Sequence, residues 1–100
     1  MTTYEATVAA VPYASRVVPH LVRHLLDTLA NAVERHALVI GMDNEVDEGP
    51  DFDSITVTLR YAADTDAQAE EIAQDAASAI HDDDPHWRVT GNSAARRTDS

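Results

Sequence analysis

The spacing of apolar residues divides the first half of the chain into a strand, a helix and a second strand. Apolar and polar positions alternate over residues 3–11, which is the period of a half-buried strand. Over residues 17–36 apolar side chains recur every three or four positions, which predicts an amphipathic helix with Pro19 in its first turn. Residues 37–42 form a short aliphatic run that predicts a second strand.

The second half of the chain begins with a polar segment and then shows strand, helix and strand again. Residues 43–53 are rich in acid and contain Gly49-Pro50, so we expect a loop. Residues 55–61 alternate strictly between apolar and polar side chains, which predicts a strand with one wet face. Thr65 and Gln68 have the spacing of a helix capping box, and small apolar residues follow at helical spacing up to Ile80. Residues 86–90 predict a last short strand.

This order of elements indicates the fold class. Strand, helix, strand, strand, helix, strand is the βαββαβ pattern of ferredoxin-like folds. We therefore predict one α+β domain over residues 1–91, followed by a C-terminal tail over residues 92–100. The domain would contain a four-stranded antiparallel sheet with two helices on one face. Right-handed connections would place the first and third strands at its centre.

The charge of the chain is strongly acidic. Asp and Glu number 18 against 7 basic residues, all of them Arg, which gives a formal net charge of -11. A phosphate backbone would be repelled, so we expect no direct binding to nucleic acid. One alternative that the sequence leaves open is a halophilic structural or dimerisation domain, in which such a surface is an adaptation to the solvent.

Half of the carboxylates fall in two predicted loops, residues 43–53 and residues 81–85 after the second helix, and the predicted topology places both loops at one end of the sheet. We expect this acidic pole to dock on a basic surface of another macromolecule, with Phe52 as an apolar anchor. An inhibitor of the kind that phages make, or a mimic of nucleic-acid phosphates, would be a narrower form of this hypothesis. The predicted partner-binding residues are Asp43, Glu45, Asp47, Glu48, Asp51, Phe52, Asp53, Asp82, Asp83 and Asp84.

Divalent-cation binding is the alternative function, and two patterns support it. Carboxylates occupy alternate positions at the start of the first acidic segment, which loosely resembles the start of a calcium loop. His20 and His24 are four residues apart on the predicted helix and share a face with Asp27, a geometry that can hold zinc. The competing interpretation is a solvent face, because Arg23 and Asn31 lie on it too.

The remaining observations narrow the class of protein. The chain has no Cys and only three Gly, so it lacks thiol chemistry and phosphate-binding glycine loops, and we predict a non-catalytic protein without a cofactor. No apolar run approaches the about 20 residues of a membrane helix, so we expect a cytoplasmic protein. A homodimer through the Thr-rich open sheet face or an exposed strand edge is a further expectation.

Overall fold

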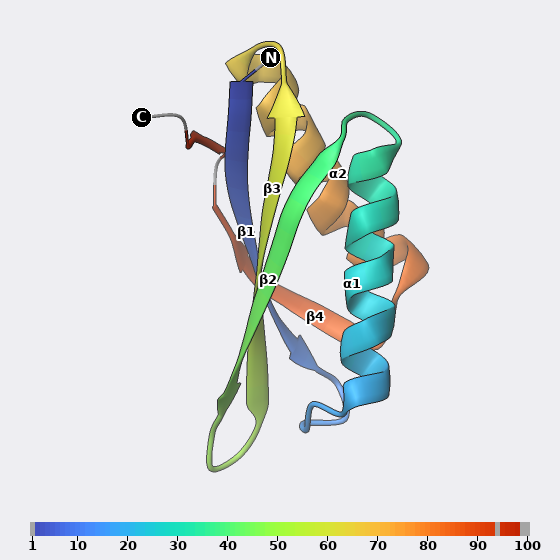
Figure 1. Ribbon diagram of the computed structural model, residues 1–100. Helices are drawn as coiled ribbons and strands as arrows, with labels where there is room; N and C mark the ends of the chain where they lie inside the picture. Colours follow the sequence, from blue (N-terminus) through green and yellow to red (C-terminus); the bar gives the residue numbers. More distant parts are fainter. Residues whose placement is uncertain (1, 94, 99–100) are drawn as a thin grey trace.

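Two helices pack on the same face of an antiparallel sheet in the computed structural model, which describes residues 2–93 and 95–98 (Figure 1). The prediction of an α+β arrangement with an antiparallel sheet and two helices is confirmed. The elements in chain order are β1 (Thr2–Pro12), α1 (Pro19–Glu34), β2 (Val39–Glu48), β3 (Asp53–Ala63), α2 (Asp66–Asp83), β4 (Trp87–Asn92) and β5 (Arg96–Arg97).

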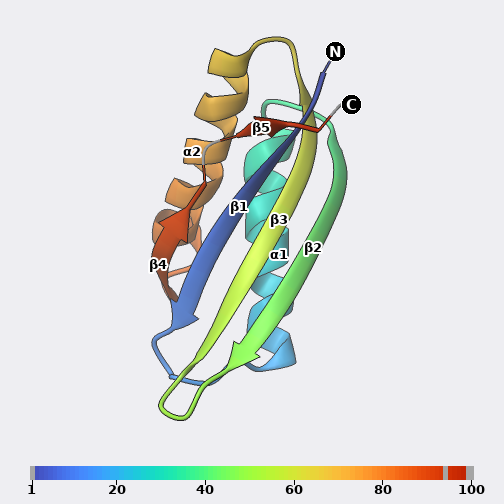
Figure 2. The same cartoon turned by 90° about the vertical axis from the view of Figure 1, so that its left-hand side faces the viewer.

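The two central strands of the sheet are β3 and β1. The order is β2-β3-β1-β4, every neighbouring pair is antiparallel, and β5 pairs with the start of β1 beyond the end of β4 (Figure 2). The predicted four strands are therefore joined by a fifth, because Arg97 pairs with Tyr4 and Arg96 with Glu5. The end of β5 thus lies beside the beginning of β1, at the end of the sheet opposite the β2–β3 turn.

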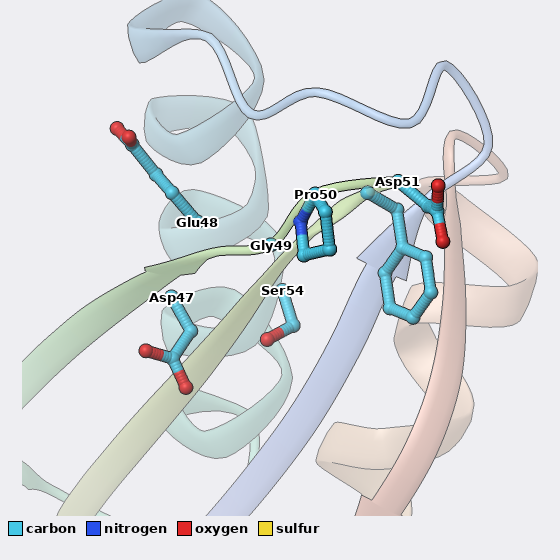
Figure 3. Close-up of a pocket in the computed structure, with 7 residues that line it drawn as sticks. Asp47, Glu48, Gly49, Pro50, Asp51 and Ser54 are labelled. Atoms are coloured by element: carbon cyan, nitrogen blue, oxygen red, sulfur yellow. The ribbon is translucent and has the colours of Figure 1, made fainter.

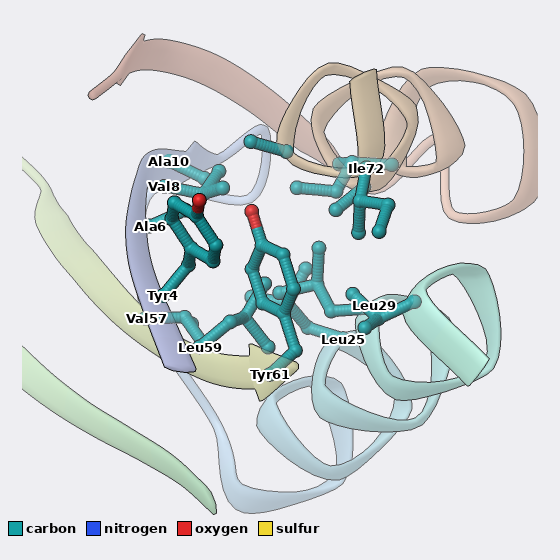
Figure 4. Packing of buried hydrophobic residues seen from close by; sticks show 14 of the residues in the cluster. Tyr4, Ala6, Val8, Ala10, Leu25, Leu29, Val57, Leu59, Tyr61 and Ile72 are labelled. Atoms are coloured by element: carbon teal, nitrogen blue, oxygen red, sulfur yellow. The ribbon is translucent and has the colours of Figure 1, made fainter. Parts of the chain in front are cut away.

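The core lies between the helices and one face of β1 and β3 (Figure 4). The alternating residues that the sequence pattern singles out are buried there, and Tyr4 lies opposite Tyr61 while Val8 lies opposite Val57. Burial of each large aliphatic side chain stabilises the fold by roughly 2 kcal/mol. The helices contribute the buried residues Leu25, Leu29, Val33, Ala69, Ile72, Ala73, Ala76 and Ile80.

Both helices begin where the sequence predicts. Pro19 occupies the first turn of α1, where its missing N–H costs no hydrogen bond. The Thr65 hydroxyl accepts a hydrogen bond from the Gln68 N–H at 3.1 Å and caps α2. The Gln68 side chain in turn accepts from the Asp64 N–H at 2.8 Å. The first contact satisfies an N–H group of the first helical turn, which has no partner inside the helix, and the second ties the residue before the cap to that turn.

The second strand is longer than the sequence predicts. The expectation of a strand ending at residue 42 and a loop over residues 43–53 is wrong, because β2 continues to Glu48 and pairs with β3 throughout. An edge strand needs backbone pairing on one side only, so its acidic side chains can remain in water. The turn that follows requires Gly49, since a Cβ atom there would lie 2.6 Å from the carbonyl oxygen of Phe52.

Candidate interaction surface

The exposed carboxylates of the first acidic segment lie on a β-hairpin. We call residues 43–53, the end of β2 with its turn to β3, the acidic hairpin. Asp43, Glu45 and Asp47 pair in register with Thr58, Thr56 and Ser54, so their side chains lie on the sheet face that carries no helix. The hairpin also exposes Glu48 and Asp51.

A shallow cavity of about 360 Å³ lies at the tip of the acidic hairpin (Figure 3). The residues that line it are Asp47, Glu48, Gly49, Pro50, Asp51, Phe52 and Ser54, and the side chain of Glu48 points away from that of Asp47 (Figure 3). Phe52 is 49% exposed, so it is not tucked onto the core and its ring remains accessible. The tip therefore combines one apolar ring with three carboxylates.

One arginine holds this hairpin against the turn that precedes α1. Arg16 Nη1 donates to the carbonyl oxygen of Gly49 at 2.8 Å and to Asp53 Oδ1 at 2.9 Å, and Nη2 donates to the carbonyl oxygen of Pro50 at 3.1 Å. Asp53 Oδ2 accepts from the Val17 N–H at 2.9 Å. The Val17 hydrogen bond, with Arg16 second, lowers the pKa of Asp53 below its usual value although burial opposes the shift.

These contacts change the expected role of Asp53, which we assigned to the partner-binding surface. Its side chain is occupied by Arg16 and Val17, and the residue is 6% exposed, so it serves the fold of the hairpin rather than an outer surface. Sequence reasoning did not identify Arg16. No local pattern indicates the contact, because 37 positions separate the two residues.

Asp84 also departs from its expected place on the surface. Its side chain is fully buried beside α1, and His24 Nδ1 lies 3.0 Å from Asp84 Oδ2. The geometry is that of an ion pair without an aligned hydrogen bond, and within the described residues neither carboxylate oxygen has an aligned donor. The contact with this carboxylate is the largest cause that raises the pKa of His24, and its negative charge adds to the effect.

The acidic residues at the end of α2 lie apart from the hairpin. Asp83 Oδ2 is 3.9 Å from Arg35 Nη2, and Asp82 lines a cavity with Arg35 and Asp75 on the helix layer. Figures 1 and 2 show the hairpin extending past the α2–β4 turn along the long axis of the molecule. The predicted single pole is therefore divided into two surfaces.

The three residues considered for zinc are not brought together with further ligands. His24 faces the buried Asp84, while His20 and Asp27 are exposed on α1. In residues 2–93 and 95–98 we find no group of three or more His, Asp or Glu side chains that could hold a metal ion. The calcium-like segment also differs from a loop, because Asp43, Glu45 and Asp47 belong to the extended strand β2.

Comparisons with known proteins identify similar folds only. No family model matches the chain, and no curated protein matches it significantly. A de novo designed protein, Foldit4, has a TM-score of 0.61 at 16% identity, with 98% of each chain covered. The C-terminal domain of the MgtC protein from Mycobacterium tuberculosis has a TM-score of 0.54 at 13% identity, covering 97% of this chain and 87% of that one. At these identities the likeness concerns the fold alone.

The helices of the described residues are too short or too polar to cross a bilayer.

Proposed function

We propose that this protein is a non-catalytic interaction module that docks its acidic hairpin on a basic surface of another macromolecule. The observation that carries the proposal is the set of unneutralised carboxylates on the hairpin. Among the described residues, Asp43 is 3.1 Å from Arg60 Nη1, but Glu45, Asp47, Glu48 and Asp51 have no arginine or histidine within ion-pair distance. Such charges attract a cationic partner over a range set by the ionic strength.

The shape of the hairpin supports the same function. The molecule measures 41 × 26 × 18 Å, and the hairpin extends along its long axis beyond the helices (Figure 1). A projecting element can enter a groove on a partner. Phe52 at the tip supplies apolar area that a charged loop alone would lack. In a more specific form of this proposal, the hairpin enters a basic groove that otherwise binds the phosphates of a nucleic acid.

We also propose that the scaffold belongs to the ferredoxin-like class, which the strand order supports.

Neutralising the hairpin tests the function. The triple variant Glu45→Gln, Asp47→Asn, Asp51→Asn removes three charges from exposed side chains and should leave the fold intact. Proteins that the wild type captures from lysate at low salt should be recovered at least tenfold less by this variant, because the attraction to a cationic surface is lost.

A matched variant controls for total charge. Glu34→Gln, Asp64→Asn, Glu71→Gln removes the same charge from exposed positions outside the hairpin. It should recover the partner as the wild type does. Equal recovery by all three proteins would refute a role of the hairpin, and equal loss in both variants would indicate attraction to net charge only.

A further inference from the structure

The outer edge of β2 has no strand partner among the residues that the structure describes. β2 is the first strand in the order β2-β3-β1-β4, so only one of its backbone edges is hydrogen-bonded. An edge strand of this kind presents a row of free N–H and C=O groups to which an extended segment can pair. The register shift between Val39 and Gly41 leaves the regular part of this edge at residues 41–48.

The two faces of this edge have different chemistry. Asp43, Glu45 and Asp47 occupy alternate positions on the helix-free face, roughly 7 Å apart along the strand. The residues between them lie on the helix side, where Val46 pairs in register with the buried Ile55. A strand laid along this edge would therefore have carboxylates beside one of its faces and, beside the other, the apolar side chains of Met42 and Val46 together with Asn44 and Glu48.

An apolar groove continues the helix side of this edge. It has a volume of about 520 Å³ and lies between β2 and the first half of α1. Val22 and Leu26 from α1 face Val46 from β2 across it, and Val46 is 38% exposed. Three charged residues, Arg23, Asp27 and Glu48, also line the groove. The exposed apolar area is thus adjacent to the unpaired backbone.

We propose that β2 binds a basic segment of the partner as an additional strand of the sheet. Arg or Lys side chains at alternate positions of the segment lie beside Asp43, Glu45 and Asp47, and the intervening apolar side chains lie toward the groove at Val46. The inference rests on the proposed function and specifies how the acidic hairpin binds: through backbone pairing as well as charge.

The charge of β2 favours a basic segment of a partner over a second copy of this chain as the added strand. In an antiparallel pair of two β2 strands, the alternating carboxylates of both copies would lie on the same face and close to one another. Like charges at such positions are destabilising, and the net charge of -11 on each copy adds to the repulsion. A segment of alternating basic and apolar residues instead places its basic side chains beside these carboxylates and an apolar side chain beside Val46 and the groove.

A synthetic peptide tests the strand addition directly. The probe is an eight-residue peptide of alternating Arg and Val, acetylated and amidated, titrated into isotope-labelled protein and followed by NMR. Shift changes should concentrate on β2, and amide hydrogens on its outer edge should exchange at least tenfold more slowly.

Two N-methylated isomers of the peptide separate backbone pairing from charge. One isomer carries a methyl group on the backbone nitrogen of every Arg, and the other carries it on the backbone nitrogen of every Val. Both isomers therefore keep the charge of the probe. In a docked strand only one of these sets of N–H groups points at β2. One isomer should therefore lose at least tenfold in affinity while the other retains it.

The outcomes distinguish this inference from the function on which it rests. Equal binding of both isomers and the parent peptide would overturn strand addition and leave attraction by charge in place. Absence of any peptide binding would overturn strand addition as well, whereas the docking function is judged separately by the hairpin variants and their natural partner.

A pair of side-chain variants tests the groove independently. Val46→Ser should weaken peptide binding about fivefold, because it removes apolar contact at the edge. Leu38→Ser, at an exposed position before β2 begins, should leave the affinity unchanged. Equal effects of the two variants would contradict the role of the groove.

Discussion

A buried carboxylate at residue 84 faces a half-exposed imidazole at residue 24. The side chain of His24 is 52% exposed, whereas that of Asp84 is fully buried. A buried charge without a counter-charge is costly, so the protonated form of His24 is favoured in the folded protein. This pair joins α1 to the start of the α2–β4 turn.

The raised pKa of His24 predicts a pH dependence of stability. The protonated His24 beside Asp84 contributes to the unfolding free energy. This contribution is fully present below the pKa of about 6.5 that His has in the unfolded chain, and it is lost as pH rises through the higher pKa of the folded protein. The difference in unfolding free energy between wild type and His24→Gln should therefore be larger at pH 5.5 than at pH 8.5. Solvent screening of the exposed ring keeps this change below the roughly 1.4 kcal/mol per pH unit that one proton can supply.

Chemical denaturation across this pH range measures the effect. His20→Gln is the control, since His20 lies exposed on the same helix and forms no ion pair in the described part of the chain. Parallel pH profiles for wild type and His24→Gln would contradict the prediction.

At the scale of elements, the turn between β1 and α1 holds three parts of the structure together. The Tyr13 N–H donates to the carbonyl oxygen of His86, and the Asp53 N–H donates to that of Ser15 at 2.7 Å. Arg16 adds the contacts to the hairpin turn. The position of the acidic hairpin therefore depends on this turn.

Ser15 has a φ of 72°, in the left-handed region that favours glycine. Ser15→Gly should relieve this strain and raise the unfolding free energy by about 1 kcal/mol. Ser15→Ala keeps the Cβ atom and should give no gain. Urea denaturation of the three proteins measures the difference, and equal stability of the Gly and Ala variants would show that the strain is absent.

The periodicity of apolar residues was sufficient to predict the helices and strands that bury one apolar face. The alternation around Val57 and the helical spacing around Leu29 both reflect burial against the core. The same signal fails for the second half of β2, where neither face is covered and no alternation results. A backbone ladder forms there without leaving a pattern in the side chains.

The candidate site was predicted in part, for a related reason. Exposed acids such as Asp47 and Asp51 could be found because surface charge is visible in composition. The buried roles of Asp53 and Asp84 could not, since each depends on a partner distant in sequence: Arg16 for one and His24 for the other. Identical residue types therefore divide between surface and interior according to tertiary contacts.

At the scale of the whole molecule, repulsion among the carboxylates opposes folding. The net charge of -11 is carried on a chain of 100 residues, and part of it is concentrated on one hairpin. At 0.1 M salt, repulsion between exposed charges that are more than a Debye length of about 10 Å apart is largely screened, and this length shortens as salt is added. Ionic strength should therefore alter stability more than it does for a neutral domain.

Raising NaCl from 0.05 to 1 M should increase the melting temperature by roughly 5 °C, equivalent to about 1 kcal/mol for a domain of this size. The Glu45→Gln, Asp47→Asn, Asp51→Asn variant should show a smaller increase than the Glu34→Gln, Asp64→Asn, Glu71→Gln variant. Calorimetry measures all three. An unchanged melting temperature would contradict strong repulsion, and a chain that folds only in molar salt would support halophilic adaptation.

The pairing of β5 with the beginning of β1 has a practical consequence for handling the protein. The Thr98 N–H donates to the carbonyl oxygen of Thr3 at 3.0 Å, so the two ends of the described chain are neighbours. They lie at the end of the long axis away from the hairpin (Figure 1). A bead, a dye or a fused domain attached near either end would therefore lie at the end of the molecule opposite the acidic hairpin and would leave the hairpin accessible to a partner.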